Sequence, residues 1–444
     1  MKRLIIAFAL CFTIVGANAQ QSKTDSIVEY RRSSLYSMLI THSALPYSAE
    51  IHTAFMNMPM PDKFNDHNLA TRAFESSVAK VKKAKNNAKK DAANMADIDN
   101  FICQNEIAKA LISKWFNRDA ATGNCNMNLI AERGYYDASQ LDIRLAEQSV
   151  RGKTQLGDAG TELIGNTFML VNDITFIDKG ENSQKAAAGL KVLGTLFGAI
   201  TGVDVDAVTD LAATAVNSID GFRVNITSYL YRLTWDEERL WSFYNQYYAD
   251  ENYSAEERNA ARDAFNALPY DDPFFGIEFI GKTTTSAANL SSKYFAEQSK
   301  EDQMLKVCTR AIDKSIVQLQ RAYEVFRVNV PIYRINEDGT VDVQIGLKEG
   351  INEKSEFDVL MPVEDENGRI TYEKVGRISP IKGKIWDNRF GALEDAKALE
   401  EDKDAKADED AAGGNAYLDA TTFKVNSGAN RIMPGCLVRE ATIK

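Results

Sequence analysis

The chain has 444 residues, of which 44% are hydrophobic, so it is long enough to form two or three domains with sizeable cores. Its formal net charge of -11 argues against nucleic acid as a partner, because a phosphate backbone is bound by a basic surface. Its five cysteines are too scattered to predict a disulfide scaffold or a zinc site.

Residues 1–19 have the pattern of a bacterial secretory signal peptide. Lys2 and Arg3 form a positive start, residues 4–15 are apolar, and Ala17-Asn18-Ala19 is a small-residue cleavage motif. The apolar run is too short for a spanning helix, and the cysteine within it lacks a lipobox. We therefore expect an exported, periplasmic protein, with association to the outer membrane as the alternative.

Four cysteines follow this segment: Cys103, Cys125, Cys308 and Cys436. An oxidising compartment would permit a bridge between Cys103 and Cys125. Free or buried thiols are an equally good interpretation for each of the four.

The next part of the chain alternates extended and helical patterns. Residues 34–40 predict a first strand, and residues 42–68 an irregular loop rich in proline and methionine. A polar, lysine-rich helix is expected over 68–95. Apolar residues recur at spacings of three and four over 98–116, which predicts an amphipathic helix. Another helix is expected over 139–151, with Ser139 as its N-cap.

The segment from 163 to 235 predicts a strand, a helical hairpin and a second strand. Residues 163–176 and 222–235 both have extended patterns, and the hairpin between them is expected over about 184–220. Its first helix presents three glycines spaced by four: Gly194, Gly198 and Gly202. Close packing within the chain is the first interpretation of this glycine face, and subunit or membrane contact are the alternatives. The helix is too short to cross a bilayer alone.

Three further elements complete a predicted α/β domain over 20–326. Residues 236–268 are expected to be helical, and residues 274–280 to form a strand. Residues 300–326 predict a long amphipathic helix, because apolar side chains fall on one stripe.

The pattern changes at Arg327. Short alternating runs then follow one another, separated by Asp-Gly, Gly and Asn-Gly turns, over 328–335, 341–345, 356–363, 370–378 and 436–439. Such runs predict a small all-β, barrel-like domain over 327–444. Within it, the acidic stretch at about 392–414 is expected to be a solvated, mobile insertion.

Three motifs suggest chemistry, and each has a simpler interpretation. Gly276–Thr283 matches a P-loop pattern, but its variable positions have strand character rather than loop character, so we interpret the match as coincidence. Lysines over 80–90 favour a solvated helix surface, with contact to anionic glycan or lipid as the alternative. Three histidines and three alternating methionines suit a copper site, or else an extended apolar segment: His42, His52, His67, Met56, Met58 and Met60.

The sequence singles out no catalytic residues and no cofactor. A G-x-S-x-G motif does not occur, histidine is confined to residues 42–67, and no pair of carboxylates stands out. We therefore expect a protein that is not an enzyme.

Part of the chain resembles the curli secretion subunit (CsgG) and TolB N-terminal-like families. The resemblance rests on Glu132-Arg133, a following helix, Gly152 and Gly157, and the strand that begins at Leu163. It implies that residues 222–235 form the antiparallel partner of that strand. A second stretch, Val343–Val359, resembles the C-terminal β-module of flagellar assembly protein T.

Together these resemblances imply an α/β sandwich domain followed by a small β-domain, in an accessory role in envelope assembly. We expect an exported, non-enzymatic structural protein that contacts other envelope proteins or further copies of itself, with membrane contact at most peripheral. One alternative is an outer-membrane-associated secretion or transport component. Another is an envelope hydrolase whose carboxylates the sequence does not single out.

Overall fold

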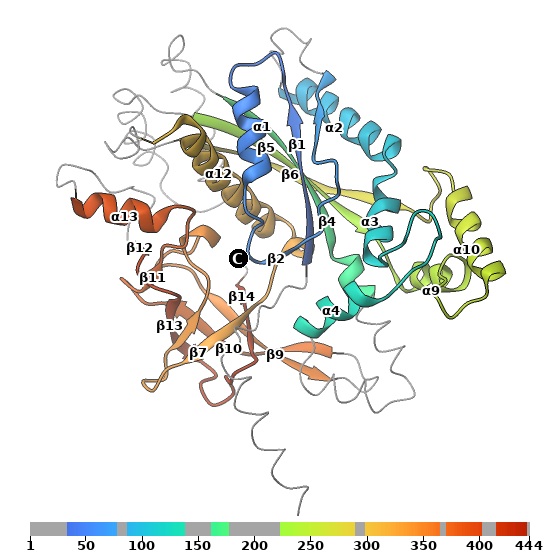
Figure 1. The fold of residues 1–444 in the computed structure, drawn as a ribbon. Coiled ribbons are helices and arrows are strands. Elements are labelled where there is room, and N and C mark those ends of the chain that lie inside the picture. Colours follow the sequence, from blue (N-terminus) through green and yellow to red (C-terminus); the bar gives the residue numbers. More distant parts are fainter. Residues whose placement is uncertain are drawn as a thin grey trace, which may run out of the picture.

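The computed structural model describes residues 33–77, 87–137, 161–176, 223–288, 298–364, 370–401 and 414–441. The signal-like segment, the helix expected over 139–151 and the predicted hairpin with Gly194, Gly198 and Gly202 lie outside these residues. The chain has mixed α and β character and contains a closed six-stranded β-barrel in its C-terminal region (Figure 1).

The N-terminal part is organised around one mixed sheet with the order β2-β1-β4-β5-β6, in which β3 also pairs with β1. Its strands are β1 (Ser33–Thr41), β2 (Phe64–Asp66), β3 (Ala73–Glu75), β4 (Thr167–Phe176), β5 (Arg223–Thr234) and β6 (Gly276–Ala288). β1 runs parallel to β4, whereas β4, β5 and β6 are antiparallel neighbours. The predicted strands β1, β4 and β5, and the antiparallel pairing of the last two, are therefore confirmed, except that residues 163–165, expected to be extended, are helical and β4 begins at Thr167.

Helices cover both faces of this sheet (Figure 1). One face packs against α1 (Ser48–Asn57) and α12 (Lys300–Ala322). The other packs against α2 (Asn87–Gln104), α3 (Ile107–Trp115), α4 (Asn128–Asp137), α9 (Glu237–Gln246) and α10 (Ala255–Ala267). Because side chains alternate along a strand, Tyr36, Met38 and Ile40 enter one core while Leu35 and Leu39 enter the other. A strand buried on both faces reads as a nearly continuous apolar run, which explains the pattern of β1.

Several predicted boundaries are wrong. The loop expected over 42–68 contains α1 and β2, and the helix expected over 68–95 contains β3, with α2 beginning only at Asn87. The single helix expected over 98–116 is divided into α2 and α3. Glu106 adopts a left-handed conformation there, with φ of 47°, which ends one helix and redirects the next.

The helical region expected over 236–268 consists of two helices, each with its own N-cap. The Asp236 side chain accepts a hydrogen bond from the Arg239 backbone at the start of α9. Ser254 and Glu257 form a capping box at the start of α10. The long helix expected over 300–326 is confirmed as α12, capped by Ser299 and followed by a short 3-10 turn, η2 (Glu324–Phe326).

The C-terminal region forms a closed barrel in the order β10-β13-β8-β7-β14-β9. The strands are β7 (Val330–Ile335), β8 (Val341–Val343), β9 (Phe357–Glu364), β10 (Ile370–Pro380), β13 (Thr421–Ser427) and β14 (Leu437–Glu440). Inward-facing side chains fill it, among them Val343, Val359, Ile378, Phe423 and Val438. The predicted small barrel is confirmed, although β13 and the short pair β11 (Ile385–Trp386) and β12 (Gly414–Asn415) were not predicted.

The acidic stretch expected to be mobile begins as an ordered helix. Residues 392–401 form α13 (Ala392–Glu401), and its Asp395 pairs with Lys306 and Arg310 of α12. Two cations on a neighbouring helix therefore hold this part of the stretch, whereas residues 402–413 lie outside the described residues. None of the helices in the described ranges has both the length and the apolar character needed to cross a bilayer.

Candidate functional site

A buried polar cluster lies where the parallel strands β1 and β4 end. His42 directly follows β1, and Asp173 lies in β4 opposite Ile40. The Asp173 side chain is almost fully buried, and His42 Nε2 lies 2.7 Å from its Oδ1. Lys90 Nζ and Asn94 Nδ2 each lie 2.8 Å from its Oδ2. Open α/β sheets bind ligands at this edge, so the position is a candidate site.

The groups of this cluster neutralise one another. Burial raises the pKa of the Asp173 carboxyl, but the hydrogen bond from His42 and the charge of Lys90 outweigh it, so the net pKa is below its ordinary value. Asn94 also donates to the Tyr229 hydroxyl at 3.2 Å, and Tyr229 donates to Asp91 at 3.1 Å. The network therefore ties α2 to the sheet through charge-assisted hydrogen bonds.

An Asp–His pair of this kind also occurs in hydrolases, where it orients the imidazole toward a nucleophile. The hydroxyls nearest in sequence are Thr41 and Ser43, and both donate to Glu75 at 2.7 Å. No described hydroxyl donates to His42. The adjoining hollow, of about 10 Å³, is lined mainly by apolar side chains and by no carboxylate. The pair in the described residues thus works as a structural tie.

A second buried cluster lies at the opposite end of β1. The Arg133 guanidinium donates to Ser34 Oγ at 2.9 Å and to the Asp66 carbonyl at 2.7 Å, and it lies 4.6 Å from the Trp115 ring centre. His67 Nε2 donates to the Leu111 carbonyl at 3.1 Å, so its Nδ1 can accept from Arg133 at 2.9 Å. Burial and the Arg133 charge hold the pKa of His67 well below its ordinary value. Arg133 therefore anchors α4 to β1 and β2.

The structure separates the residues of the copper hypothesis. His42 and His67 lie at opposite ends of β1 and are committed to Asp173 and Arg133, while His52 is exposed on α1. Met58 and Met60 line one hollow together with Asp313. Among the described residues, no group of three or more His, Cys, Asp or Glu side chains is placed to hold a metal ion.

The other motifs are placed as follows. The P-loop match lies wholly within β6, which confirms its strand character. Of the lysine-rich segment, Lys90 is described and pairs with Asp173. Cys103, Cys125, Cys308 and Cys436 are all unpaired, and the last three are buried.

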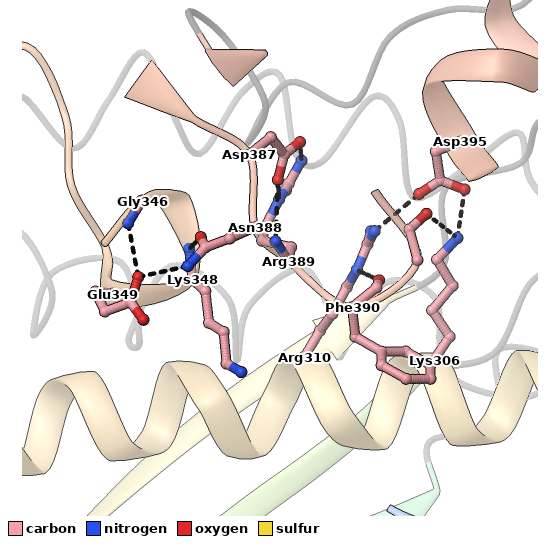
Figure 2. A network of polar contacts seen from close by, with 11 residues as sticks. Lys306, Arg310, Gly346, Lys348, Glu349, Asp387, Asn388, Arg389, Phe390 and Asp395 are labelled. Carbon is pink, nitrogen blue, oxygen red and sulfur yellow. Dashed lines mark hydrogen bonds and ion pairs between the residues drawn. The ribbon is translucent and has the colours of Figure 1, made fainter. Parts of the chain in front are cut away.

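A polar seam joins α12 to the barrel and to α13, and Figure 2 shows the end of it at which Lys306 and Arg310 of α12 reach Asp395 of α13. Arg310 donates to the Phe390 carbonyl at 2.9 Å and to Asp395 at 2.8 Å, and Lys306 pairs with the same carboxylate. Further along α12, Arg321 forms a two-point pair with Glu440 of β14, at 2.8 and 3.0 Å. Because α12 also packs against the sheet, one helix couples the two parts of the chain.

The same seam explains two glycines of the barrel. Gly346 and Gly350 flank the short turn η3 (Leu347–Glu349), which contacts α12. A Cβ on Gly346 would lie 2.1 Å from the Trp386 carbonyl oxygen. Gly350 has φ of +70°, and its carbonyl accepts from Arg321 at 3.0 Å. Close approach at one position and a left-handed backbone at the other both require glycine.

An aromatic ridge crosses α9 and the turn after it, and we define it as Trp241, Tyr244, Tyr248 and Tyr253. Trp241 and Tyr244 are three residues apart on one face of α9, Tyr248 follows the end of the helix, and Tyr244 and Tyr248 also pack against the core beneath α9. Ring centres lie 5.2 Å apart for Tyr244 and Tyr248 and 6.3 Å apart for Tyr248 and Tyr253. Trp241 is 57% exposed and Tyr253 40% exposed. Figure 1 places α9 and α10 at the end of the molecule away from the barrel.

Sequence reasoning missed the two buried clusters and the ridge. The one available signal for Asp173 was the polar pair Asn172-Asp173 inside an otherwise apolar strand. In comparisons with known proteins, no family model matches this chain. No curated protein matches it either.

Proposed function

We propose that this protein is an exported, non-enzymatic assembly protein of the cell envelope that acts through protein–protein contacts. The observation that supports it best is the aromatic ridge on α9, since exposed tryptophan and tyrosine are enriched at protein interfaces. Residues 236–267 around it carry eight acidic and three basic side chains. The expected partner surface is therefore basic with apolar anchors, on another envelope protein.

The coupling of the two parts through α12 supports the same role. A scaffold must hold its interaction surfaces at fixed positions; α12 packs its apolar side chains on the sheet and forms ion pairs with α13 and β14 through Arg310 and Arg321. The resemblance to the CsgG and TolB N-terminal-like families fits this proposal. The proposal includes an α/β domain over 20–326 with an inserted helical hairpin. It also includes a periplasmic location after cleavage of the signal peptide.

The alternatives differ in what they require. A secretion or transport component requires the hairpin of residues 184–220 to contact the outer membrane. A glycoside-type hydrolase requires two carboxyl groups about 5–9.5 Å apart in a cleft. The two hollows described here are lined by no carboxylate and by Asp313 alone, respectively. The described residues thus favour neither alternative over the assembly role.

The test is affinity capture from an envelope extract with the full chain as bait. Wild type is compared with Trp241→Ser and with the matched control Tyr417→Ser, which removes a similarly exposed ring from the barrel side. We expect a basic envelope protein to be captured by wild type and by the control, with roughly thirtyfold weaker binding to Trp241→Ser, the loss typical of an interface hot spot. Added salt should weaken the complex, because the ridge lies in an acidic surround.

Equal binding of all three baits would overturn the role of the ridge. Capture that is insensitive to both substitutions and to salt would contradict the proposed partner chemistry. Since Trp241 is largely exposed, its replacement should leave the thermal midpoint within about 2 °C of wild type, which separates lost binding from lost folding.

A further inference from the structure

A short segment of chain lies over helix α12 between α1 and β2, and we call residues 58–63 the strap. It belongs to no helix or strand, and two of its residues are prolines, which have no backbone N–H. At its start Met58 donates to the Phe55 carbonyl at 3.3 Å, and near its end Phe64 donates to the Pro61 carbonyl at 3.0 Å. A segment outside the regular elements can open on its own while the sheet stays folded.

The strap is tied to the barrel by two consecutive side chains. Asp62 pairs with Lys348 of η3 at 2.9 Å, and Lys63 Nζ donates to the Gln344 carbonyl at 2.7 Å. Figure 2 shows the Lys348 side chain extending from η3 toward α12. The strap is therefore one of the contacts through which the N-terminal part of the chain holds the barrel.

On its other side the strap covers Asp313 of α12. Residues 58–61 and Asp313 line a hollow of about 20 Å³, which leaves room for about one water molecule and for no larger ligand. Asp313 is 8% exposed, and its Oδ2 is buried without a hydrogen-bond partner. Within the described residues no bonded group would compensate a negative charge on this carboxyl, so its ionisation in the closed structure is unfavourable.

Charged groups face Asp313 from every element packed against it. They are Lys348 and Glu349 of η3, Asp62 of the strap, Arg310 of α12 itself, and Arg72, which lines the same hollow. Lys348 and Arg310 favour ionisation, but their ion pairs are with Asp62 and Asp395. The two acids oppose ionisation, and burial outweighs all of these charges, which raises the pKa of Asp313 to about 7.

We propose that the strap is a pH-sensitive lid on Asp313, closed while this carboxyl is neutral and opened when it ionises. The charged carboxylate reaches water when the strap lifts from α12. Lifting it separates Asp62 from Lys348 and Lys63 from the Gln344 carbonyl. The junction between sheet and barrel is therefore tight in acid and loosens above neutral pH. The proposal is independent of the aromatic ridge and of the assembly role.

The experiment is hydrogen exchange of the full chain at pH 6 and pH 8, read by mass spectrometry and corrected for the intrinsic exchange rate. The closed carboxyl has a pKa of about 7, and the open one returns to its ordinary 3.8, so closing weakens as pH rises between these values. We expect the open fraction in peptides that cover the strap and η3 to be about tenfold larger at pH 8. The strap should also exchange at least roughly a hundredfold faster than β4, because its opening is local.

Two variants with no ionisable group at this position test the cause. In Asp313→Asn and Asp313→Ser the strap should change less than about twofold between the two pH values. The control Asp263→Asn, which removes an exposed acid on α10, should keep the wild-type response. An equal response in wild type and in the two Asp313 variants would overturn the proposal. So would strap exchange as slow as that of β4, because ionisation would then be coupled to global unfolding. Near-UV circular dichroism identifies a misfolded variant, and the other Asp313 variant then decides.

Discussion

Replacing Asp313 by asparagine should make the stability of this protein less dependent on pH. Burial raises the pKa of the Asp313 carboxyl from 3.8 to about 7. Lys348 and Arg310 lower it, while Glu349 and Asp62 raise it further, and the net result is set by burial. The folded protein therefore holds this proton over a pH range in which the unfolded chain has lost it.

The sign follows from proton linkage. Because the folded state binds more protons than the unfolded state between about pH 4 and pH 7, stability falls as pH rises through that window. The full penalty is about 3 pKa units, or about 4 kcal/mol, and most of it develops below pH 7. Between pH 5 and pH 8 wild type should lose about 2.5 kcal/mol relative to Asp313→Asn, since the amide does not titrate.

The assay is urea unfolding of both proteins at pH 5 and pH 8. The result is the change in the free energy of unfolding of wild type between the two pH values, minus the same change in Asp313→Asn. Other titrating groups are common to both proteins and cancel. The control Asp263→Asn removes an exposed carboxylate and should show no such change. If the gap between wild type and Asp313→Asn is the same at both pH values, the carboxyl is not held protonated by burial. If wild type instead gains stability relative to Asp313→Asn toward pH 8, the folded state favours the ionised carboxylate and the reasoning from burial is refuted.

Two further substitutions probe the structural ties. Asp173→Asn should cost about 3 kcal/mol in urea unfolding at pH 7, because it leaves His42 and Lys90 facing a neutral amide. Since the pKa of Asp173 is lowered in the folded state, its stabilisation is present above the unfolded-state pKa and should fade as pH falls through the folded-state value. Gly346→Ala should cost about 2 kcal/mol or more in the calorimetric stability of the barrel, because the new Cβ meets the Trp386 carbonyl.

Each of these two substitutions has a matched control variant. Asp263→Asn should have the same free energy of unfolding as wild type. If it loses as much stability as Asp173→Asn, the loss in Asp173→Asn cannot be assigned to the buried network. Gly339→Ala introduces a methyl with no atom within 4 Å, and its cost should be limited to the strain of a left-handed backbone. An equal cost at Gly346 and Gly339 would contradict the close approach to Trp386.

Local sequence patterns predicted the strands that are buried along their length and the helix that buries one stripe. β1, β4 and β5 are buried along their length, and α12 carries one apolar stripe, so their sequences carry the period of the structure. The break between α2 and α3 could not be predicted, because it depends on Glu106 in a left-handed conformation with no glycine to mark it. β13 was missed because its polar side chains alternate with few apolar ones.

The candidate sites depended on contacts that sequence order does not display. His42 and Asp173 are 131 residues apart, and only the parallel pairing of β1 with β4 brings them together. Asp313 lies on a helix whose apolar stripe was predicted, yet its hollow is completed by residues 55–61 and Arg72 from the other side. Whether an acidic side chain on an amphipathic helix is buried becomes clear only when the facing element is known.

The residues behind the family resemblances also have local physical causes. Arg133 is buried between Trp115 and the start of β1, where a guanidinium satisfies three acceptors at once. Gly346 and Gly350 are fixed by a carbonyl contact and a left-handed backbone at the α12 seam. Each motif thus marks a junction between elements rather than a reacting group. Residues at such junctions determine how this chain packs, so a partner of this protein is better sought at the aromatic ridge.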